Sequence, residues 1–553
     1  MPQKPVLIIH PTPLGQIDVL ARDLFDGFWF PPSSDRGLIR IGIIPSRKTV
    51  RFRALQRTRI FVFSHKETWE VASPEGVIWT AEVLSLSRPG IVTYFSAVKN
   101  ALKKGGNQLS SSEVHFWKKL GFHGARWIGP PNHENPQENL QKNLTSKTSL
   151  ERWFLSVTPP TGKEQAREIC KKIQNRFKSS CEVISRVELP PIGRGILRAE
   201  NSNFAKEFEG VLEIISPYGP VEIFDVIIEE RKNETSSEKY GPRLFIVPGT
   251  ELDLSLTQTT SLTNYLEGVL PAEIFPNAPM EALRAQAIVA RTYAIRHVRS
   301  EESLRPYSIC ASTNCQAYRG IPYKQERTSQ AVYETSDFVL KDSKGELSET
   351  FYHSICGGHT ESRIEVWGPP PLPYLAGISD QINNRKFDPM KTQEQVKTYL
   401  EDVPTAYCGI ASLTKRDRWR WTQSLDQNAV ENILLRTGLS PPLVDIEIQK
   451  RGISGRVFAL KLKTGNDSKV VYGEFTIRQL LGGLLSSLFA IEPESKDGKI
   501  NSLLIHGGGS GHGVGLCQMG AIGRAEQGQT FREILTAYYP GTILAPLVEP
   551  MLP

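Results

Sequence analysis

The chain has 553 residues, longer than a single hydrophobic core needs, so two or three domains are expected. A hydrophobic content of 39%, a charged content of 23%, 44 Gly and 38 Pro are typical of a globular protein with many turns and exclude the collagen, coiled-coil and disordered classes. The net charge of +7 fits an acidic polymer as partner. Nucleic acid is not expected, because zinc-finger spacing, RNP-like motifs and long Lys/Arg runs are all missing from the sequence.

The N-terminal sequence does not have the pattern of a secretory leader. In PVLIIHPTPLG the apolar run ends after four residues, whereas a leader has about 7 to 15. The sequence also has no stretch near the roughly 20 apolar residues of a transmembrane helix. Taken literally, this predicts a cytosolic chain; the alternative is that a leader precedes residue 1.

Residues 1–131 are expected to form a β-rich region, beginning with the strand pattern GLIRIGIIP at residues 37–45. Residues 132–149 are polar and have no aromatic side chain, which is the composition of a linker. Residues 150–200 then alternate strand (RWFLSV), helix (GKEQAREICKKIQNRFK) and strand (CEVISRVEL), which predicts a small inserted βαβ module.

A larger domain is expected over residues 205–545. It starts with β character at Phe208, and its most helical pattern runs from Tyr265 to Arg299, where small apolar residues recur at intervals of three and four. Short strands and helices alternate in the remainder. The predicted class is α+β and multi-domain, with a mixed β-rich core and a helix-bearing catalytic cleft.

Four motifs carry a family resemblance. They are YLEGVLPAEIFP (265–276), EALRAQAIVARTYA (281–294), YHSICGGHTE (352–361) and GSGHGVGLCQMGA (509–521). Together and in this order they resemble the SpoIID/LytB family of peptidoglycan-active proteins, over roughly residues 208–545. The module at 150–200 is similar in pattern to the SPOR repeat, which binds glycan stripped of stem peptides, although any ferredoxin-like half would show the same alternation.

The resemblance assigns the catalytic role to Glu273. The sequence predicts this carboxylate at a bend before a helix, between Leu270 and the pair Ile274–Phe275, an apolar rim that would raise a carboxyl pKa by desolvation. Ordinary glycosidases need two carboxylates. A lytic transglycosylase needs one, because the 6-hydroxyl of muramic acid is the nucleophile. The alternative is that Glu273 caps the next helix electrostatically.

The same motifs supply candidates for substrate binding. On the helix, Gln286 and Arg291 could bind sugar hydroxyls, N-acetyl groups or the lactyl carboxylate, but a structural role is equally open. The Gly-rich block lacks the Lys-Ser/Thr ending of a nucleotide loop, so its Gly turns are expected to bring His512 and Gln518 to the glycan. Cys517 in this block is interpreted as a small-residue replacement. The substrate-binding candidates are Gln286, Arg291, Tyr293, Gln316, Tyr318, His512 and Gln518.

Sporulation members of the family hold zinc between two Cys and two His, and Cys310 and Cys315 match the cysteines. The matching histidine places are Leu304 and Asn314, so the same site would need other ligands to complete it. A disulfide between Cys310 and Cys315, or free buried thiols, is the alternative. The candidate ligands for a structural zinc are Cys310, Cys315, Cys356 and His359, with His353 as a substitute for His359.

The resemblance implies an enzyme, a peptidoglycan lytic transglycosylase that needs no cofactor for its chemistry. Its implied partners are glycan strands and a cell-wall amidase that strips them, in the extracytoplasmic cell envelope. One alternative is a noncatalytic, glycan-binding enhancer of an N-acetylmuramoyl-L-alanine amidase. Another is a cytosolic scaffold with a decayed site.

Overall fold

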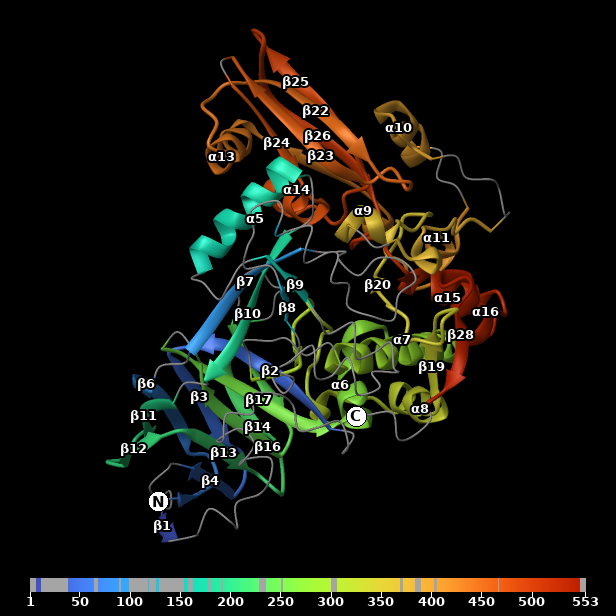
Figure 1. Ribbon diagram of the computed structural model, residues 1–553. Helices are drawn as coiled ribbons and strands as arrows, with labels where there is room; N and C mark the ends of the chain where they lie inside the picture. The colour runs from blue at the N-terminus through green and yellow to red at the C-terminus, as the bar shows by residue number, and fades with distance from the viewer. Residues whose placement is uncertain are drawn as a thin grey trace. The chain divides into compact units, whose positions relative to one another are not determined.

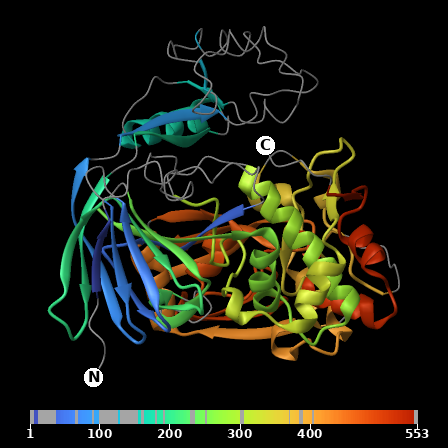
Figure 2. The same cartoon turned by 90° about the horizontal axis from the view of Figure 1, so that it is seen from below.

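The computed structural model in Figures 1 and 2 contains both sheets and helices, which confirms the α+β class. It describes residues 6–10, 38–63, 68–88, 91–98, 118, 126–128, 154–157, 163–177, 181–189, 192–227, 235–249, 252–299, 306–368, 371–382, 389–401, 405–465 and 467–547. The chain divides into two compact units. The first comprises residues 1–269, 297–323 and 549–553, and the second residues 270–296 and 324–548.

The first unit is built on two large sheets. The eight-stranded sheet has the order β1 (Val6–His10), β5 (Thr68–Ser73), β4 (Thr58–Phe63), β13 (Val211–Ile215), β16 (Arg243–Pro248), β17 (Leu254–Ser261), β2 (Leu38–Arg47) and β18 (Ile309–Cys310). The six-stranded sheet has the order β12 (Ala205–Glu209), β11 (Ile192–Ala199), β6 (Ile78–Arg88), β3 (Thr49–Ala54), β14 (Val221–Ile227) and β15 (Thr235–Tyr240). All pairs are antiparallel except β18 with β2.

The core of this unit lies between the two sheets, where β11 contacts β16 and β3 contacts β17. Strand β3 contributes one face to this core. Its residues Val50, Phe52 and Ala54 are completely buried and alternate with more exposed residues, as the two-residue period of a strand requires. Strands β13, β14 and β17 pair with β4, β3 and β2, so residues 205–261 share their sheets with the N-terminal region. The predicted domain start at 205 therefore does not coincide with a break in the structure.

A four-stranded sheet in the order β10 (Cys181–Leu189), β7 (Ile91–Val98), β9 (Phe154–Ser156) and β8 (Arg126–Ile128) forms the module. Helix α5 (Lys163–Phe177) joins β9 to β10, and the Cys170–Cys181 disulfide ties α5 to β10. The predicted βαβ unit is present, but β7 lies between its two strands. The sheet of the module thus starts at residue 91 and not at the predicted residue 150, because β7 pairs with both β9 and β10. Its strand order is that of ferredoxin-like folds; a SPOR identity stays a prediction. The predicted linker at 132–149 lies outside the described residues.

The second unit combines short sheets with many helices. Both units share helices α6 (Leu262–Glu273) and α7 (Met280–Arg299). The other helices of the second unit are α8 (Glu326–Glu334), α9 (Arg363–Trp367), α10 (Gln393–Glu401), α11 (Tyr407–Ile410), α12 (Arg416–Trp419), α13 (Gln427–Thr437), α14 (Glu474–Leu480), α15 (Gln518–Glu526) and α16 (Phe531–Tyr538). Its sheets are β21 (Arg420–Leu425), β26 (Lys499–Gly508) and β25 (Phe489–Lys496); β22 (Leu443–Arg451), β23 (Val457–Thr464) and β24 (Ser468–Tyr472); β19 (Phe338–Lys341) with β28 (Ile543–Pro546); and β20 (Tyr352–His353) with β27 (Leu516–Cys517).

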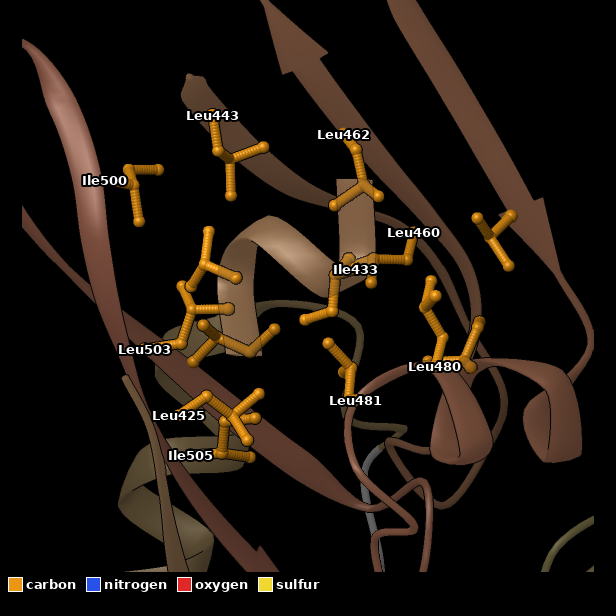
Figure 3. Close-up of a cluster of buried hydrophobic side chains, with 14 of the residues drawn as sticks. Leu425, Ile433, Leu443, Leu460, Leu462, Leu480, Leu481, Ile500, Leu503 and Ile505 are labelled. Atoms are coloured by element: carbon orange, nitrogen blue, oxygen red, sulfur yellow. The ribbon is translucent and has the colours of Figure 1, made fainter. Parts of the chain in front are cut away.

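An apolar core in the C-terminal half packs α13 and α14 against β23 and β26 (Figure 3). Ile433 of α13, Leu460 and Leu462 of β23 and Leu503 of β26 are among its buried side chains. Helix α13 is well delimited: the Asp426 carboxylate accepts a hydrogen bond from the Ala429 N–H at its start, and Gly438 ends it in the left-handed conformation. Among the described residues, no helix is long and apolar enough to cross a membrane.

Candidate functional site

Glu273 is the last residue of α6. Pro271 is tolerated within this helix near its end, and the helix stops before the segment that leads to Met280 at the start of α7. Glu273 thus stands directly before the bend that precedes the next helix, as predicted, with six residues between it and Met280. Glu273 is partly exposed; of the expected apolar rim, Ile274 is buried but Phe275 is 43% exposed.

Tyr293, on α7, lies beside Glu273. Burial raises the pKa of the Tyr293 hydroxyl, and the negative charge of Glu273 raises it further. The Tyr293 ring is largely buried and meets Phe351 edge to face, with the ring centroids 6.3 Å apart. Sequence reasoning predicts Tyr293 as a glycan contact; the structure pairs it with the predicted catalytic carboxylate.

Aromatic and imidazole rings continue from Phe351. The Phe351 and Trp367 centroids are 4.3 Å apart, and those of Trp367 and His512 are 5.0 Å apart. The predicted residues Tyr293 and His512 are therefore linked through Phe351, and Trp367, 43% exposed, presents an aromatic surface to solvent. Together these five residues, Glu273, Tyr293, Phe351, Trp367 and His512, are called the Glu273 site below.

His512 is held in one orientation by the Gly-rich loop. Its Nδ1 accepts a hydrogen bond from the Val514 N–H at 3.0 Å, which leaves the Nε2 as the protonated nitrogen of the neutral ring. Desolvation lowers the pKa of His512 well below the usual value, and the neighbouring His353 and Arg456 lower it further. His512 is thus a neutral Nε2–H donor at pH 7.

Gln286 and Gln518 are buried amides. Within the described part of the chain, neither amide atom of Gln286 has a hydrogen-bond partner, and the same is true of Gln518 Nε2. A buried polar group without a partner is rare in folded proteins, and such groups often bind water or a ligand. The role of both side chains in binding substrate stays a prediction.

Arg291 has a structural role. It is 2% exposed, and its guanidinium donates to the carbonyl oxygens of Val332 (2.9 Å) and Thr335 (2.7 Å) at the C-terminal end of α8, and to that of Phe338 (3.3 Å) at the start of β19. These contacts satisfy carbonyls that a helix end leaves unpaired. These donors are engaged with the backbone, and glycan binding by Arg291 stays a prediction.

Gln316 and Tyr318 belong to the first unit and lie in its interior. The Tyr318 hydroxyl donates to Gln258 Oε1 at 3.0 Å, and the Tyr318 ring stacks on Tyr265, whose hydroxyl donates to Gln316 Oε1 at 3.2 Å. Gln316 and Tyr318 have 0% and 1% of their surface exposed. Packing and hydrogen bonding account for their positions, and their role as glycan contacts stays a prediction.

The predicted zinc ligands are not brought together. Cys310 and Cys315 form a disulfide in the first unit, the alternative that the sequence left open, so their thiolates are not available to a metal. His359 is buried, and its Nδ1 hydrogen-bonds the Thr360 carbonyl oxygen at 2.6 Å. The two-cysteine, two-histidine arrangement of the family therefore does not fit this chain.

Cys356 instead lies among three side chains that sequence analysis did not connect with it. One donor atom from each of the four residues lies within 4.8 Å of the others, and all four residues are buried. Cys517, interpreted from the sequence as a small-residue replacement, is one of them. This group, called the thiol–carboxylate cluster, consists of Cys356, Asp380, Cys408 and Cys517.

Comparison with known families matches residues 250–341 to the stage II sporulation protein family and residues 361–515 to a domain of unknown function. The chain is 29% identical over 305 residues to an uncharacterized protein of Brachyspira hyodysenteriae, covering 55% of this chain and 71% of that relative. It is 28% identical over 296 residues to the amidase enhancer of Bacillus subtilis, covering 50% of this chain but 40% of that relative. It is 27% identical over 328 residues to the stage II sporulation protein D of Bacillus amyloliquefaciens, covering 57% and 82% of the two chains.

Proposed function

Because this chain belongs to the SpoIID/LytB family, we propose that it is a peptidoglycan lytic transglycosylase, which cleaves glycan strands between MurNAc and GlcNAc. The observation that carries the proposal is the pairing of Glu273 with Tyr293: a partly exposed carboxylate lies beside a buried hydroxyl, within the segment matched by the stage II sporulation family. A carboxyl with one polar neighbour and an exposed side suits a group that must exchange a proton with substrate.

The chemistry requires one acid–base group. Glu273, in its carboxylic acid form, gives its proton to the glycosidic oxygen as the bond from the MurNAc anomeric carbon to that oxygen breaks. The MurNAc 6-hydroxyl oxygen forms a new bond to the anomeric carbon and closes the 1,6-anhydro ring. Its proton passes to the Glu273 carboxylate, which restores the acid. Water is not consumed, so a second carboxylate is not needed.

The other members of the Glu273 site bind and orient the sugar. The exposed face of Trp367 offers an apolar surface for a pyranose ring, and the neutral His512 ring, held by backbone hydrogen bonds to Val514 and Tyr352, packs against Trp367 and supports this surface. Gln286 and Gln518 add amide groups for the same polar substituents. The Tyr293 hydroxyl is close enough to be influenced by the charge of Glu273, and a hydrogen bond from it to the ionised carboxylate would orient Glu273 between proton transfers.

The substrate is peptidoglycan outside the cytoplasm, on strands whose stem peptides an amidase has removed. The mild positive charge of the chain suits the lactyl carboxylates that such stripping exposes. The relatives named stage II sporulation protein D and amidase enhancer support a cell-wall setting and an amidase as functional partner.

Purified wild-type protein incubated with peptide-free glycan strands tests the proposal. Mass spectrometry should detect 1,6-anhydro ends, and Glu273→Gln should lower their rate of formation by a factor of about 10² or more, since an acid–base group contributes about that much. Glu447→Gln, at an exposed site on β22, is the matched control and should react like wild type. If wild-type protein produces no anhydro ends, the proposed enzyme activity is wrong.

The second candidate is a noncatalytic enhancer that binds glycan and accelerates an amidase. It is favoured by the similarity to the amidase enhancer, although the alignment covers 40% of that relative. Adding an N-acetylmuramoyl-L-alanine amidase to intact peptidoglycan separates the two functions. Faster release of stem peptides with both wild type and Glu273→Gln, and no anhydro ends with either, would establish the enhancer.

A further inference from the structure

The thiol–carboxylate cluster draws its four members from distant parts of the second unit. Cys356 follows β20, and Cys517 ends the neighbouring parallel strand β27 and precedes α15. Asp380 lies in the loop after residues 373–375, and Cys408 lies in the first turn of α11. Folding thus gathers three thiols and one carboxylate from separate chain segments and buries them completely.

The distances within the cluster fit a metal ion better than a covalent bond. Cys356 Sγ lies 3.3 Å from Cys408 Sγ and 3.6 Å from Asp380 Oδ2. A disulfide requires about 2.05 Å between sulfurs. Four ligands around a tetrahedral Zn²⁺ ion, with Zn–S near 2.3 Å and Zn–O near 2.1 Å, lie roughly 3.6–3.8 Å from one another. The three thiols are also free of disulfides in the structure.

Backbone donors and a helix N-terminus face the sulfur atoms of the cluster. The backbone N–H of Cys356 donates to Cys517 Sγ at 3.1 Å, and that of Gly520 donates to the same sulfur at 3.3 Å. The Gly358 N–H donates to Cys356 Sγ at 3.4 Å. Cys517 also stands at the N-terminal end of α15, where the helix dipole favours a thiolate. Such donors lower the cost of burying negative sulfur.

Asp380 is arranged as a ligand with a supporting shell. Its Oδ1 accepts from the Tyr538 hydroxyl at 2.7 Å and from Arg524 Nη2 at 3.2 Å, while its Oδ2 faces the thiols. Metal-ligating carboxylates are typically oriented in this way through their second oxygen. With a divalent cation bound, the three thiolates and the carboxylate would carry four negative charges, and the ion and Arg524 together would offset three of them.

We propose that the thiol–carboxylate cluster binds one structural Zn²⁺ ion. Three soft sulfur ligands exclude Mg²⁺ and Ca²⁺, and four protein ligands in a closed, buried tetrahedron are the signature of structural rather than catalytic zinc. The ion ties the YHSICGG segment to the GVGLCQMG segment and to the loops between them, and thereby fixes the backbone next to His512 and Gln518. The site differs from the family's two-cysteine, two-histidine arrangement, and the inference does not depend on the proposed glycan chemistry.

Zinc content measured on the full chain, purified without chelator under mildly reducing conditions, tests the site. Elemental analysis should find about one zinc per chain, and Cys408→Ser should lose most of it. The double variant Cys310→Ser/Cys315→Ser is the matched control, because it removes two sulfurs at the family's zinc position and should retain the metal. Loss of zinc from the double variant but not from Cys408→Ser would overturn the proposal.

Measurements on the unmutated protein keep the proposal testable if Cys408→Ser does not fold. After replacement of zinc by Co²⁺, the protein should show the intense thiolate-to-cobalt absorption and the visible bands of a tetrahedral sulfur-rich site. The three thiols should resist alkylation until a chelator is added. Zinc-free protein that gives no cobalt spectrum, or peptide mapping that finds a disulfide among Cys356, Cys408 and Cys517, would refute the site.

Discussion

Tyr293 lies so close to Glu273 that the charge of the carboxylate adds to burial in raising the pKa of the tyrosine hydroxyl. Glu273 ends α6, and Tyr293 stands on α7, the next helix along the chain. A hydroxyl beside a carboxylate stabilises the ionised form when it donates to it. The tyrosine is therefore expected to set the proton affinity of the catalytic group.

Replacing Tyr293 by Phe tests this relationship. We expect transglycosylase activity to fall about tenfold, and the limb of the pH–rate profile that belongs to the catalytic carboxyl to move to higher pH, because its ionised form loses a donor. Tyr333→Phe, on the exposed side of α8, is the control. A lower rate with an unshifted profile would mean that Tyr293 acts only by packing.

Arg291→Met should destabilise the protein without affecting its substrate affinity. The substitution leaves the carbonyl oxygens at the end of α8 without their buried donor, and we expect a loss of about 3 kcal/mol in the free energy of unfolding. Chemical denaturation measures the loss, with the exposed Arg436→Met as control. If Arg291 bound glycan, KM would rise while the denaturation midpoint stayed in place.

Gly520→Ala should destabilise α15 and its surroundings. A Cβ at this position would overlap the Tyr538 hydroxyl and lie 2.7 Å from Asp380 Oδ2, so a neighbouring side chain or the helix has to move. Overpacking of this kind lowers stability by about 1–3 kcal/mol. Gly465→Ala, where a Cβ meets no atom within 4 Å, is the control for the thermal unfolding measurement. Equal melting temperatures for the two variants would contradict the predicted clash.

His359 should make stability depend on pH. Burial lowers the pKa of His359 from 6.5 to about 4, so between these values the unfolded chain binds the proton more strongly than the folded chain. The contribution of neutral His359 to the free energy of unfolding is present above about pH 6.5 and is lost as the pH falls towards 4. Its upper limit is about 3 kcal/mol. Denaturation of zinc-free protein across this range should give a shallower slope for His359→Gln than for wild type or the control His506→Gln. Parallel curves would show that His359 does not contribute.

The helices of the Glu273 site could be predicted because their signal is local. Small apolar residues recur along α7 at helical spacing, and the motif around Glu273 is continuous in sequence. The role of Arg291 could not be predicted in the same way, since its partners are carbonyls at the end of α8, about 40 residues later. A buried arginine that caps another helix has the same sequence appearance as one that binds a ligand.

The thiol–carboxylate cluster escaped prediction for a similar reason. Its members are spread from residue 356 to 517, and neither Asp380 nor Cys408 stands in a metal-binding motif. Zinc-site recognition from sequence depends on ligands a few residues apart. The module boundary was also missed through non-local pairing, because β7 enters the sheet from a segment that precedes the polar linker.

Strand pairing around the module has a consequence for the architecture of the chain. Strand β6 leads towards β7 and β10 leads towards β11, and each outgoing strand pairs with its returning one: Arg88 faces Ile192, and Ile91 faces Leu189. The points where the chain enters and leaves the module are therefore neighbours at the end of one antiparallel ladder. The module is thus inserted between two strands, β6 and β11, that pair directly with each other, and we expect a tight turn in its place to let β6 run directly into β11.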